Sequence, residues 1–245
     1  AELTPLAEKR CLFEKLGVDI LIEFPLNAET AAISAEEFVQ KVLTEQMNTS
    51  YIVAGSDLSF GAGGKGDSHL LHRMKEKCGF TVEIISKILY EDREISSSYV
   101  REAVEAGDMK TASRLLGRQY SISGTVKSGK KLGRRLGMPT LNIYPGKDKL
   151  LPPNGVYYSV VNCRGREYKA ITNIGKKPTV NDTETVSVET YLYDYEGDLY
   201  GAEAVVFFVE YKRAEKKFES VEALKEQMKK DVEDGRRYHG LESNG

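Results

Sequence analysis

The sequence predicts two folds in one chain: an α/β unit with a doubly wound parallel sheet, followed by an all-β unit that forms a small antiparallel barrel with a C-terminal helix. Two observations support this prediction. In the first half, short apolar runs alternate with amphipathic helical patterns, which favours a parallel sheet. In the second half, runs rich in aromatic and β-branched residues follow closely on one another, with turn residues such as Arg164-Gly165 between them.

The expected elements of the first half alternate along the chain, and each has its own local signal. In order, they are a helix that Thr4 caps and Pro5 opens, a buried strand over Val18–Phe24, a helix from Ser34 to about Gln46, a strand over Tyr51–Ala54, a helix over His69–Lys77 and a strand over Phe80–Ile85. Because the chain begins with Ala1 inside this pattern, we expect further residues to precede it. His69 and His72 are expected at the surface.

A helical hairpin is predicted to end the first half. Ser97 or Ser98 begins its first helix and Gly107 ends it, while Asp108 caps the second helix and Gly117 ends that one. We place the domain boundary here, which gives domains of residues 1–117 and 118–245.

The second half is predicted to contain short strands and one long helix. The strands are expected at Tyr120–Val126, Gly155–Asn162, Tyr168–Asn173, Val186–Leu192 and Ala204–Glu210. A final helix starts at Ser220, and its apolar face of Val221, Leu224, Met228 and Val232 is expected to pack on the barrel. His239, in the tail, is expected to be solvated.

Composition excludes several classes of protein. The 245 residues carry a formal net charge of −2, so the chain has no global attraction for nucleic acid or anionic membranes. Three widely spaced cysteines form neither a disulfide framework nor a zinc ribbon. No apolar run approaches the length that spans a membrane. We therefore expect a cytoplasmic protein with no nucleic-acid or membrane partner.

Residues 124–142 combine glycines and cations in a short span that stops at Pro139. Glycines let backbone N–H groups approach phosphates, and cations supply the countercharge. Thr140 and Asn142, two apart on an extended chain, point to one face and offer the oxygen ligands that Mg²⁺ accepts beside phosphates. The span predicts a nucleotide–magnesium site, although a solvated basic hairpin fits the pattern equally well. It is not a P-loop, since Gly133 is followed by Arg134.

Several ordered motifs resemble riboflavin kinase. They are Gly124-x-Val126, Gly129, Gly133-Arg134-x-Leu136-Gly137-x-Pro139-Thr140-x-Asn142, Pro153-Asn154-Gly155-Val156-Tyr157, Thr172-Asn173-Ile174-Gly175-x-x-Pro178-Thr179 and Val188-Glu189-Thr190-Tyr191-Leu192. The whole chain is similar to the bacterial bifunctional riboflavin kinase/FAD synthetase family. The family usually has alanine where Leu141 stands, on the face opposite Thr140.

This resemblance implies the fold and the activities in more detail. It implies a Rossmann-like nucleotidyltransferase domain, FMN adenylyltransferase-like and incomplete at its start, over residues 1–117. It implies a Greek-key barrel with riboflavin kinase activity over residues 118–245. The substrates would be riboflavin, FMN and ATP, and both reactions would require Mg²⁺.

The resemblance also assigns roles in the kinase half. Glu189 maps to the catalytic base, and ATP and Mg²⁺ contacts map to Gly129, Lys131, Gly133, Arg134, Gly137, Thr140 and Asn142, with Asn173 as a loop contact. By its pattern alone, Glu189 faces either solvent or a site. Phe218, Leu224 and Met228 are candidates for a flavin pocket, and the pattern alone favours ordinary core packing for each.

In the amino-terminal half, the motifs match the FMN adenylyltransferase module. Gly55-x-Asp57-x-x-Phe60-Gly61 resembles its second motif, and Ile95-Ser96-Ser97-Ser98-x-x-Arg101 resembles its triphosphate site at a helix N-terminus. Leu58-Ser59 and Tyr99 depart from the family pattern. The family's Gly-x-Phe-Asp-Gly-x-His-x-Gly-His motif is absent from these residues, so we expect inefficient adenylylation of FMN.

The leading hypothesis is a riboflavin kinase that forms FMN, joined to a domain that, when intact, adenylylates FMN to FAD. One alternative is a kinase whose amino-terminal domain is degenerate. Another is a regulator that binds flavin or nucleotide without turnover. Nucleic-acid binding by the basic residues 127–135 is disfavoured because that stretch lacks aromatic residues for stacking.

Overall fold

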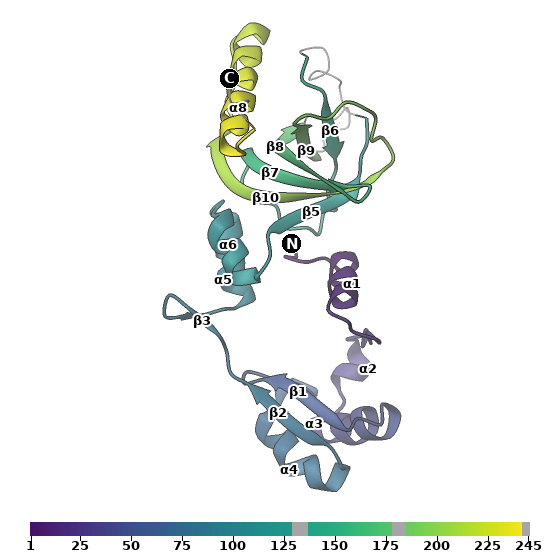
Figure 1. Cartoon of the computed structure of the whole chain (residues 1–245). Helices are drawn as coiled ribbons and strands as arrows, with labels where there is room; N and C mark the ends of the chain where they lie inside the picture. The colour runs from purple at the N-terminus through teal and green to yellow at the C-terminus, as the bar shows by residue number, and fades with distance from the viewer. Residues whose placement is uncertain (129–136, 178–184, 242–245) are drawn as a thin grey trace. The chain divides into compact units, whose positions relative to one another are not determined.

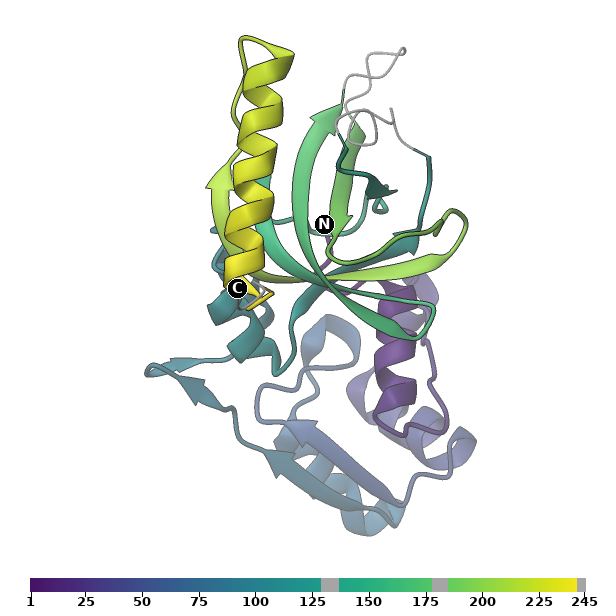
Figure 2. The ribbon, with the colours of Figure 1, turned by 45° about the horizontal axis from the view of Figure 1, so that its top comes forward.

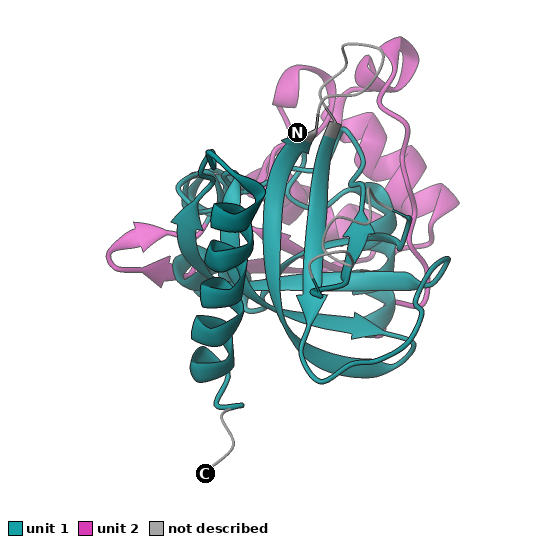
Figure 3. Cartoon of the chain, turned by 90° about the horizontal axis from the view of Figure 1, so that it is seen from above, with its two compact units in different colours: residues 1–16, 96–245 teal, residues 17–95 magenta. Residues whose placement is uncertain are grey.

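The computed structural model describes residues 1–128, 137–177 and 185–241 (Figure 1). The chain forms two compact units, one of residues 1–16 and 96–245 and one of residues 17–95, coloured separately in Figure 3. Each unit has its own sheet. This confirms the predicted combination of an α/β unit and an all-β unit.

Residues 17–95 are built around a β-α-β arrangement. Strand β1 (Tyr51–Gly55) pairs in parallel with β2 (Thr81–Ile85), and helix α4 (Ser68–Cys78) connects them. The core of this unit gathers around Val39, Leu71 and Phe80. The remaining elements are α2 (Ala28–Ala31), α3 (Ala35–Glu37), the π-helical η1 (Phe38–Gln46), the 3₁₀ turn η2 (Ala62–Gly64) and a small hairpin of β3 (Leu89–Tyr90) and β4 (Arg93–Glu94).

Most predicted elements of this unit are confirmed within one or two residues. The Ser34 hydroxyl caps α3, and the Asp67 carboxylate caps α4. His69 and His72 are exposed, as expected.

The buried strand expected over Val18–Phe24 is wrong. No strand is assigned there, and Ile20 is 77% exposed. An apolar run signals a tendency to burial, but a strand also needs a neighbouring edge for its backbone groups. In the described residues, β1 pairs only with β2, so this segment has no strand beside it.

The larger unit contains a six-stranded sheet in the order β5-β10-β7-β8-β9-β6. The strands are β5 (Tyr120–Thr125), β6 (Thr140–Ile143), β7 (Gly155–Cys163), β8 (Arg166–Lys177), β9 (Thr185–Leu192) and β10 (Glu203–Ala214). Because β10 returns to lie beside β7, the order β10-β7-β8-β9 is a Greek key. A bridge between Lys127 and Asn142 joins the end of β5 to β6 and closes the sheet into a barrel.

Alternate side chains of these strands fill the barrel. Tyr157, Phe208 and Ile174 are among the fully buried interior residues. The opposite face of β7, β8 and β10 carries helix α8 (Val221–Tyr238), which runs along one side of the curled sheet in Figure 2. Helix α8 begins directly after Ser220, where the final helix was predicted to start, and the Ser220 hydroxyl caps it.

Three further helices belong to the barrel unit: α1 (Leu6–Lys15), α5 (Ser97–Glu105) and α6 (Met109–Leu116). Pro5, rather than the expected Thr4, is the N-cap residue of α1. Asp108 caps α6 and Gly117 ends it in a left-handed conformation, as predicted. The two compact units are defined by which residues contact one another in space. The domain boundary between residues 117 and 118 was inferred from the sequence and stays a prediction.

Candidate active site

A row of polar side chains crosses three strands on the outer face of the barrel. Asn142 in β6 lies directly opposite Glu189 in β9, and Glu189 lies directly opposite Asn173 in β8. Cross-strand partners project from the same face, with Cβ atoms about 5 Å apart. The fold therefore brings together three residues that lie far apart in the sequence.

Thr140 lies in the next row of the same face. It pairs with Tyr191, two residues along β9 from Glu189. Leu141, between Thr140 and Asn142, projects into the barrel and is 6% exposed. This confirms that the substituted position is on the opposite face from the polar pair.

Glu189 is half-buried, and the Ser187 hydroxyl donates to its carboxylate at 3.4 Å. Asn142 is 4% exposed, its backbone carbonyl accepts from Lys127 N–H at 2.8 Å, and its side-chain amide donates to the Thr140 carbonyl at 3.3 Å. Both ends of the predicted glycine-rich span are thereby fixed beside Glu189. Gly137 is exposed with a φ of 80°. The other predicted phosphate contacts, Gly129, Lys131, Gly133 and Arg134, lie outside the described residues.

A cavity of about 480 Å³ separates this face of the sheet from α8. We call it the helix cavity. Polar groups of the strands line one part, and apolar side chains of α8 and the segment before it line another. Its lining includes Thr140, Asn173, Glu189, Arg213 and Glu215 together with Ile171, Tyr191, Phe218, Leu224, Met228 and Val232. The size and mixed lining suit a flat, largely apolar ligand with polar edges.

A buried carboxylate fixes α8 against the barrel. Asp231 is 5% exposed and accepts hydrogen bonds from Nε and Nη2 of Arg213 and from the Gln227 amide at 3.1 Å. It also forms an ion pair with Lys212 at 3.2 Å. β10 has two register shifts, and the second places Glu210 and Arg213, three residues apart, opposite positions two apart on β7. Arg213 thus contacts Asp231 of α8, and this ion-pair cluster forms part of the wall of the helix cavity.

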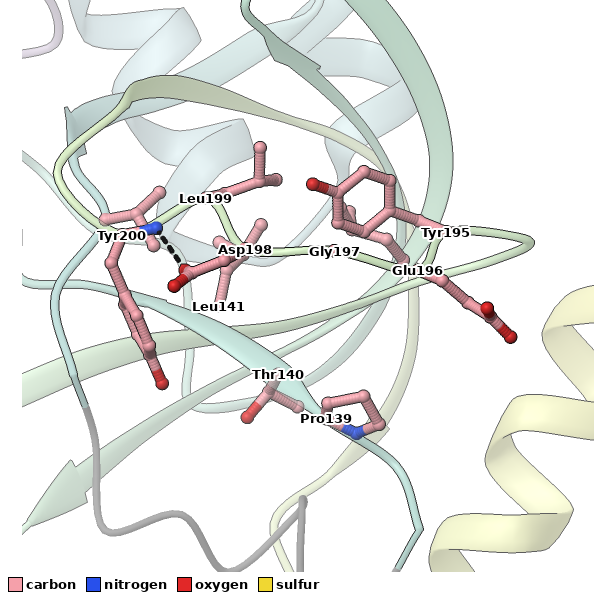
Figure 4. Close-up of a pocket in the computed structure, with 11 residues that line it drawn as sticks. Pro139, Thr140, Leu141, Tyr195, Glu196, Gly197, Asp198, Leu199 and Tyr200 are labelled. Carbon is pink, nitrogen blue, oxygen red and sulfur yellow. Dashed lines mark hydrogen bonds between the residues drawn. The ribbon is translucent and has the colours of Figure 1, made fainter.

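A second cavity, of about 290 Å³, lies on the other side of Thr140. We call it the loop cavity. Figure 4 shows Pro139 and Thr140 on one side and the segment from Tyr195 to Tyr200 on the other. The Asp198 carboxylate accepts from the Tyr200 N–H at 2.8 Å and so closes the turn. Thr140 lines both cavities.

The predicted residues of the amino-terminal half are also placed by the structure. Gly55 ends β1, and the Asp57 carboxylate pairs with Lys87 at 3.2 Å, a hydrogen bond that lowers the pKa of Asp57. The Ser96 hydroxyl caps α5 by accepting from Tyr99 N–H at 3.2 Å.

Ser97 and Ser98 are exposed in the first turn of α5. Arg101, one turn further along the helix, donates to the Ala1 carbonyl at 2.8 Å. The predicted phosphate contacts of α5, namely Ser96, Ser97, Ser98 and Arg101, belong to the barrel unit, whereas Gly55 and Asp57 belong to the other unit.

Sequence reasoning missed Arg213, Glu215 and the Tyr195–Tyr200 turn as parts of these cavities. Arg213 and Glu215 lie at and beyond the end of a strand predicted to stop at Glu210, and the bulges disrupt its alternation. The signal that could have found them is the continued β-branched and aromatic pattern up to Tyr211.

Comparison with known proteins places these features in a family. The family model for riboflavin kinase matches residues 116–239, and that for FAD synthetase matches residues 1–99. The bifunctional riboflavin kinase/FMN adenylyltransferase of Bacillus subtilis is 35% identical over 96% of this chain and 75% of its own length. That of Escherichia coli is 33% identical over 98% of this chain and 77% of its own length.

Among solved structures, a Streptococcus pneumoniae protein described as a macrolide-efflux protein matches with a TM-score of 0.85 and 30% identity, over 96% of this chain and 75% of that one. Within the described residues, no helix is both long and apolar enough to cross a membrane.

Proposed function

Because this chain belongs to the bifunctional riboflavin kinase/FMN adenylyltransferase family, we propose that its barrel unit transfers the γ-phosphoryl group of ATP to the terminal hydroxyl of riboflavin. The products are FMN and ADP. The observation that supports this assignment is the row of Asn142, Glu189 and Asn173 beside Thr140, the residue that lines both cavities.

Phosphoryl transfer requires the two substrates to be bound next to each other. Thr140 lines both cavities, so we take the place beside Thr140 as the point where the substrates meet. The helix cavity suits riboflavin, since it is the larger and its apolar part can take the flavin ring. The loop cavity then takes the nucleoside of ATP. The family resemblance assigns the phosphates to the glycine-rich span, of which Gly137 is described. Glu189 lies on the riboflavin side of Thr140, as a base for the attacking hydroxyl requires.

In the proposed reaction, Glu189 accepts the proton of the riboflavin hydroxyl as its oxygen bonds to the γ-phosphorus. The bond from that phosphorus to the β–γ bridging oxygen breaks, and ADP leaves with the electron pair. Mg²⁺, when bound, would neutralise charge on the phosphates. The Thr140 hydroxyl and Asn142 amide oxygen fit such an ion, because Mg²⁺ keeps most of its ligands as waters and phosphates and needs few from protein. Among the described residues, no cluster of three or more His, Cys, Asp or Glu side chains competes for it.

The amino-terminal part supports the second activity of the family, the transfer of AMP from ATP to FMN. We assign the ATP phosphates to Ser96, Ser97, Ser98 and Arg101 at the start of α5. For residues 17–95, considered separately, we assign nucleotide contacts to Gly55 and Asp57. A cytoplasmic location remains part of the proposal, supported by the three free cysteines.

Substitution of Glu189 tests the kinase assignment. Glu189→Gln keeps the shape of the side chain but cannot accept the proton, so we expect FMN formation from riboflavin and ATP to fall by about 10²-fold or more. Riboflavin binding, measured by flavin fluorescence, should change little. The matched control is Glu167→Gln, an exposed glutamate of β8 that pairs with Lys169, which should retain full turnover. Full turnover by Glu189→Gln would remove Glu189 from this role.

A further inference from the structure

We propose that the Glu215 carboxylate binds the polyol chain of the flavin substrate, and so distinguishes a ribityl flavin from the bare ring. This inference rests on the assignment of the helix cavity to riboflavin. The family resemblance assigned no role to Glu215, which directly follows the last residue of β10 and lines the helix cavity.

The Glu215 side chain reaches back across the sheet. Its Oε2 accepts from the Asn154 amide at 3.1 Å, at the start of β7. Its Oε1 lies over Gly175 of β8, so close that a Cβ atom on Gly175 would overlap it. The Asn173 amide nitrogen would lie 3.1 Å from that same added Cβ atom, so both side chains lie over Gly175. The carboxylate of Glu215, the residue that follows β10, therefore lies beside the polar row described above, in space that only a glycine leaves open.

This position is one row from the proposed catalytic base. Gly175 is opposite Ser187, and the Ser187 hydroxyl lies 3.4 Å from the Glu189 carboxylate. Since Glu189 must reach the terminal hydroxyl of the polyol chain, the preceding hydroxyls of that chain pass near Glu215. The third carboxylate of the cavity, Asp231, is already bonded to Arg213 and Lys212.

The chemistry of the ligand agrees with this placement. An ionised carboxylate only accepts hydrogen bonds. The edge of the flavin ring offers a single N–H donor among several acceptors, whereas each polyol hydroxyl can donate. The apolar side chains of α8, such as Leu224 and Met228, suit the ring. The carboxylate pairs best with the hydroxyls.

Two probes separate the polyol from the ring: riboflavin, and lumiflavin, which has the same isoalloxazine ring with a methyl group in place of the ribityl chain. Loss of a charge-assisted hydrogen bond in Glu215→Ala should weaken riboflavin binding roughly tenfold. Lumiflavin binding should stay within about twofold, and the KM for riboflavin should rise more than kcat falls. Binding is measured by flavin fluorescence, and the chain has no tryptophan to interfere. Glu167→Ala is the matched control, and Glu215→Gln should restore part of the affinity.

Gly175→Ala gives an independent test, because the added methyl group displaces the Glu215 carboxylate and Gly175 has no positive φ to strain. It should weaken riboflavin binding alone, and it should add little to Glu215→Ala in the double variant. Equal weakening of both probes, or no weakening of riboflavin, overturns the proposal. If either result occurs while Glu189→Gln still loses turnover, the proposed role of Glu215 is refuted and the kinase assignment stands. If Glu189→Gln is fully active, the assignment of Glu189 in the kinase reaction is refuted, independently of Glu215.

Discussion

At the residue scale, the glycine in helix α8 is explained by a side chain that packs directly against its backbone. Gly235 lies inside α8 and is buried, where an alanine would ordinarily favour a helix by about 1 kcal/mol. A Cβ there would overlap the hydroxyl of Tyr193, which donates to the Val232 carbonyl of the same helix at 2.9 Å. The glycine therefore allows α8 to lie close against the strand segment that follows β9.

We predict that Gly235→Ala destabilises the barrel unit by about 1–3 kcal/mol, because overpacking outweighs the gain in helix propensity. Thermal unfolding measures this. Tyr193→Phe removes the overlapping hydroxyl, so Gly235→Ala should cost less in a Tyr193→Phe background than in the native one. An increase in stability from Gly235→Ala alone would show that the contact is not tight.

At the level of elements, α8 is attached to the barrel near its middle and at its C-terminal end. Near its middle, Asp231 pairs with Arg213, and near its C-terminus Tyr238 stacks on Tyr158 with ring centroids 3.9 Å apart. His239, expected to be solvated, is instead half-buried among these tyrosines, and its Nε2 lies 3.0 Å from the Ala170 carbonyl. The expectation was wrong because residues distant in the sequence enclose the end of the helix.

The burial of His239 predicts a dependence on pH. Burial lowers the pKa of its imidazole from the ordinary 6.5, with a smaller contribution from Lys169. His239 therefore binds a proton more tightly in the unfolded chain than in the folded protein. As the pH falls through about 6.5, this difference lowers the free energy of unfolding, and the decrease levels off below the pKa of His239 in the folded protein. At neutral pH and above, it costs none.

We therefore expect the stability of the native protein relative to His239→Asn to decrease between about pH 7.5 and 5. Thermal or urea unfolding at both pH values measures this difference. His72→Asn, at an exposed position of α4, is the control and should show no such change. A constant difference between native protein and His239→Asn would contradict the shift.

For the whole molecule, the notable arrangement is that the first helix belongs to the barrel unit. Lys149, 6% exposed, donates to the Leu3 carbonyl at 2.9 Å and to the Glu8 carboxylate at 2.6 Å. Its ammonium also lies 4.5 Å from the centre of the Tyr120 ring. One buried cation thus joins α1 to β5 and to the segment before β7.

Lys149→Met should release α1 and destabilise the barrel unit by about 3 kcal/mol, since Glu8 is left without its partner in a largely buried position. Hydrogen exchange would show faster exchange in residues 6–15 and unchanged exchange in residues 17–95. Lys41→Met, which breaks the exposed pair with Glu37, should leave stability measurably unchanged. Equal protection of α1 in native protein and Lys149→Met would refute this role.

Prediction from sequence succeeded where local signals suffice. The caps Ser34 and Asp108 act within a few residues, and both were predicted correctly, as was the start of the last helix at Ser220. It failed for Val18–Phe24, because pairing needs a neighbouring strand, and for the end of β10, where two bulges break the alternation. The motifs identified Glu189, Asn142 and Asn173 as candidates, but their alignment in one row depends on the register of three strands.

The sequence by itself therefore determined the two fold types, most helix and strand positions and the family, because periodicity, caps and ordered motifs are local properties of the chain. The tertiary structure decided which side chains share a cavity. Register aligned Asn142, Glu189 and Asn173, the Asp231 ion pairs set the position of α8, and Gly175 admitted the carboxylate of Glu215. These are contacts between residues separated by many positions, and their geometry follows from packing and strand pairing rather than from local pattern.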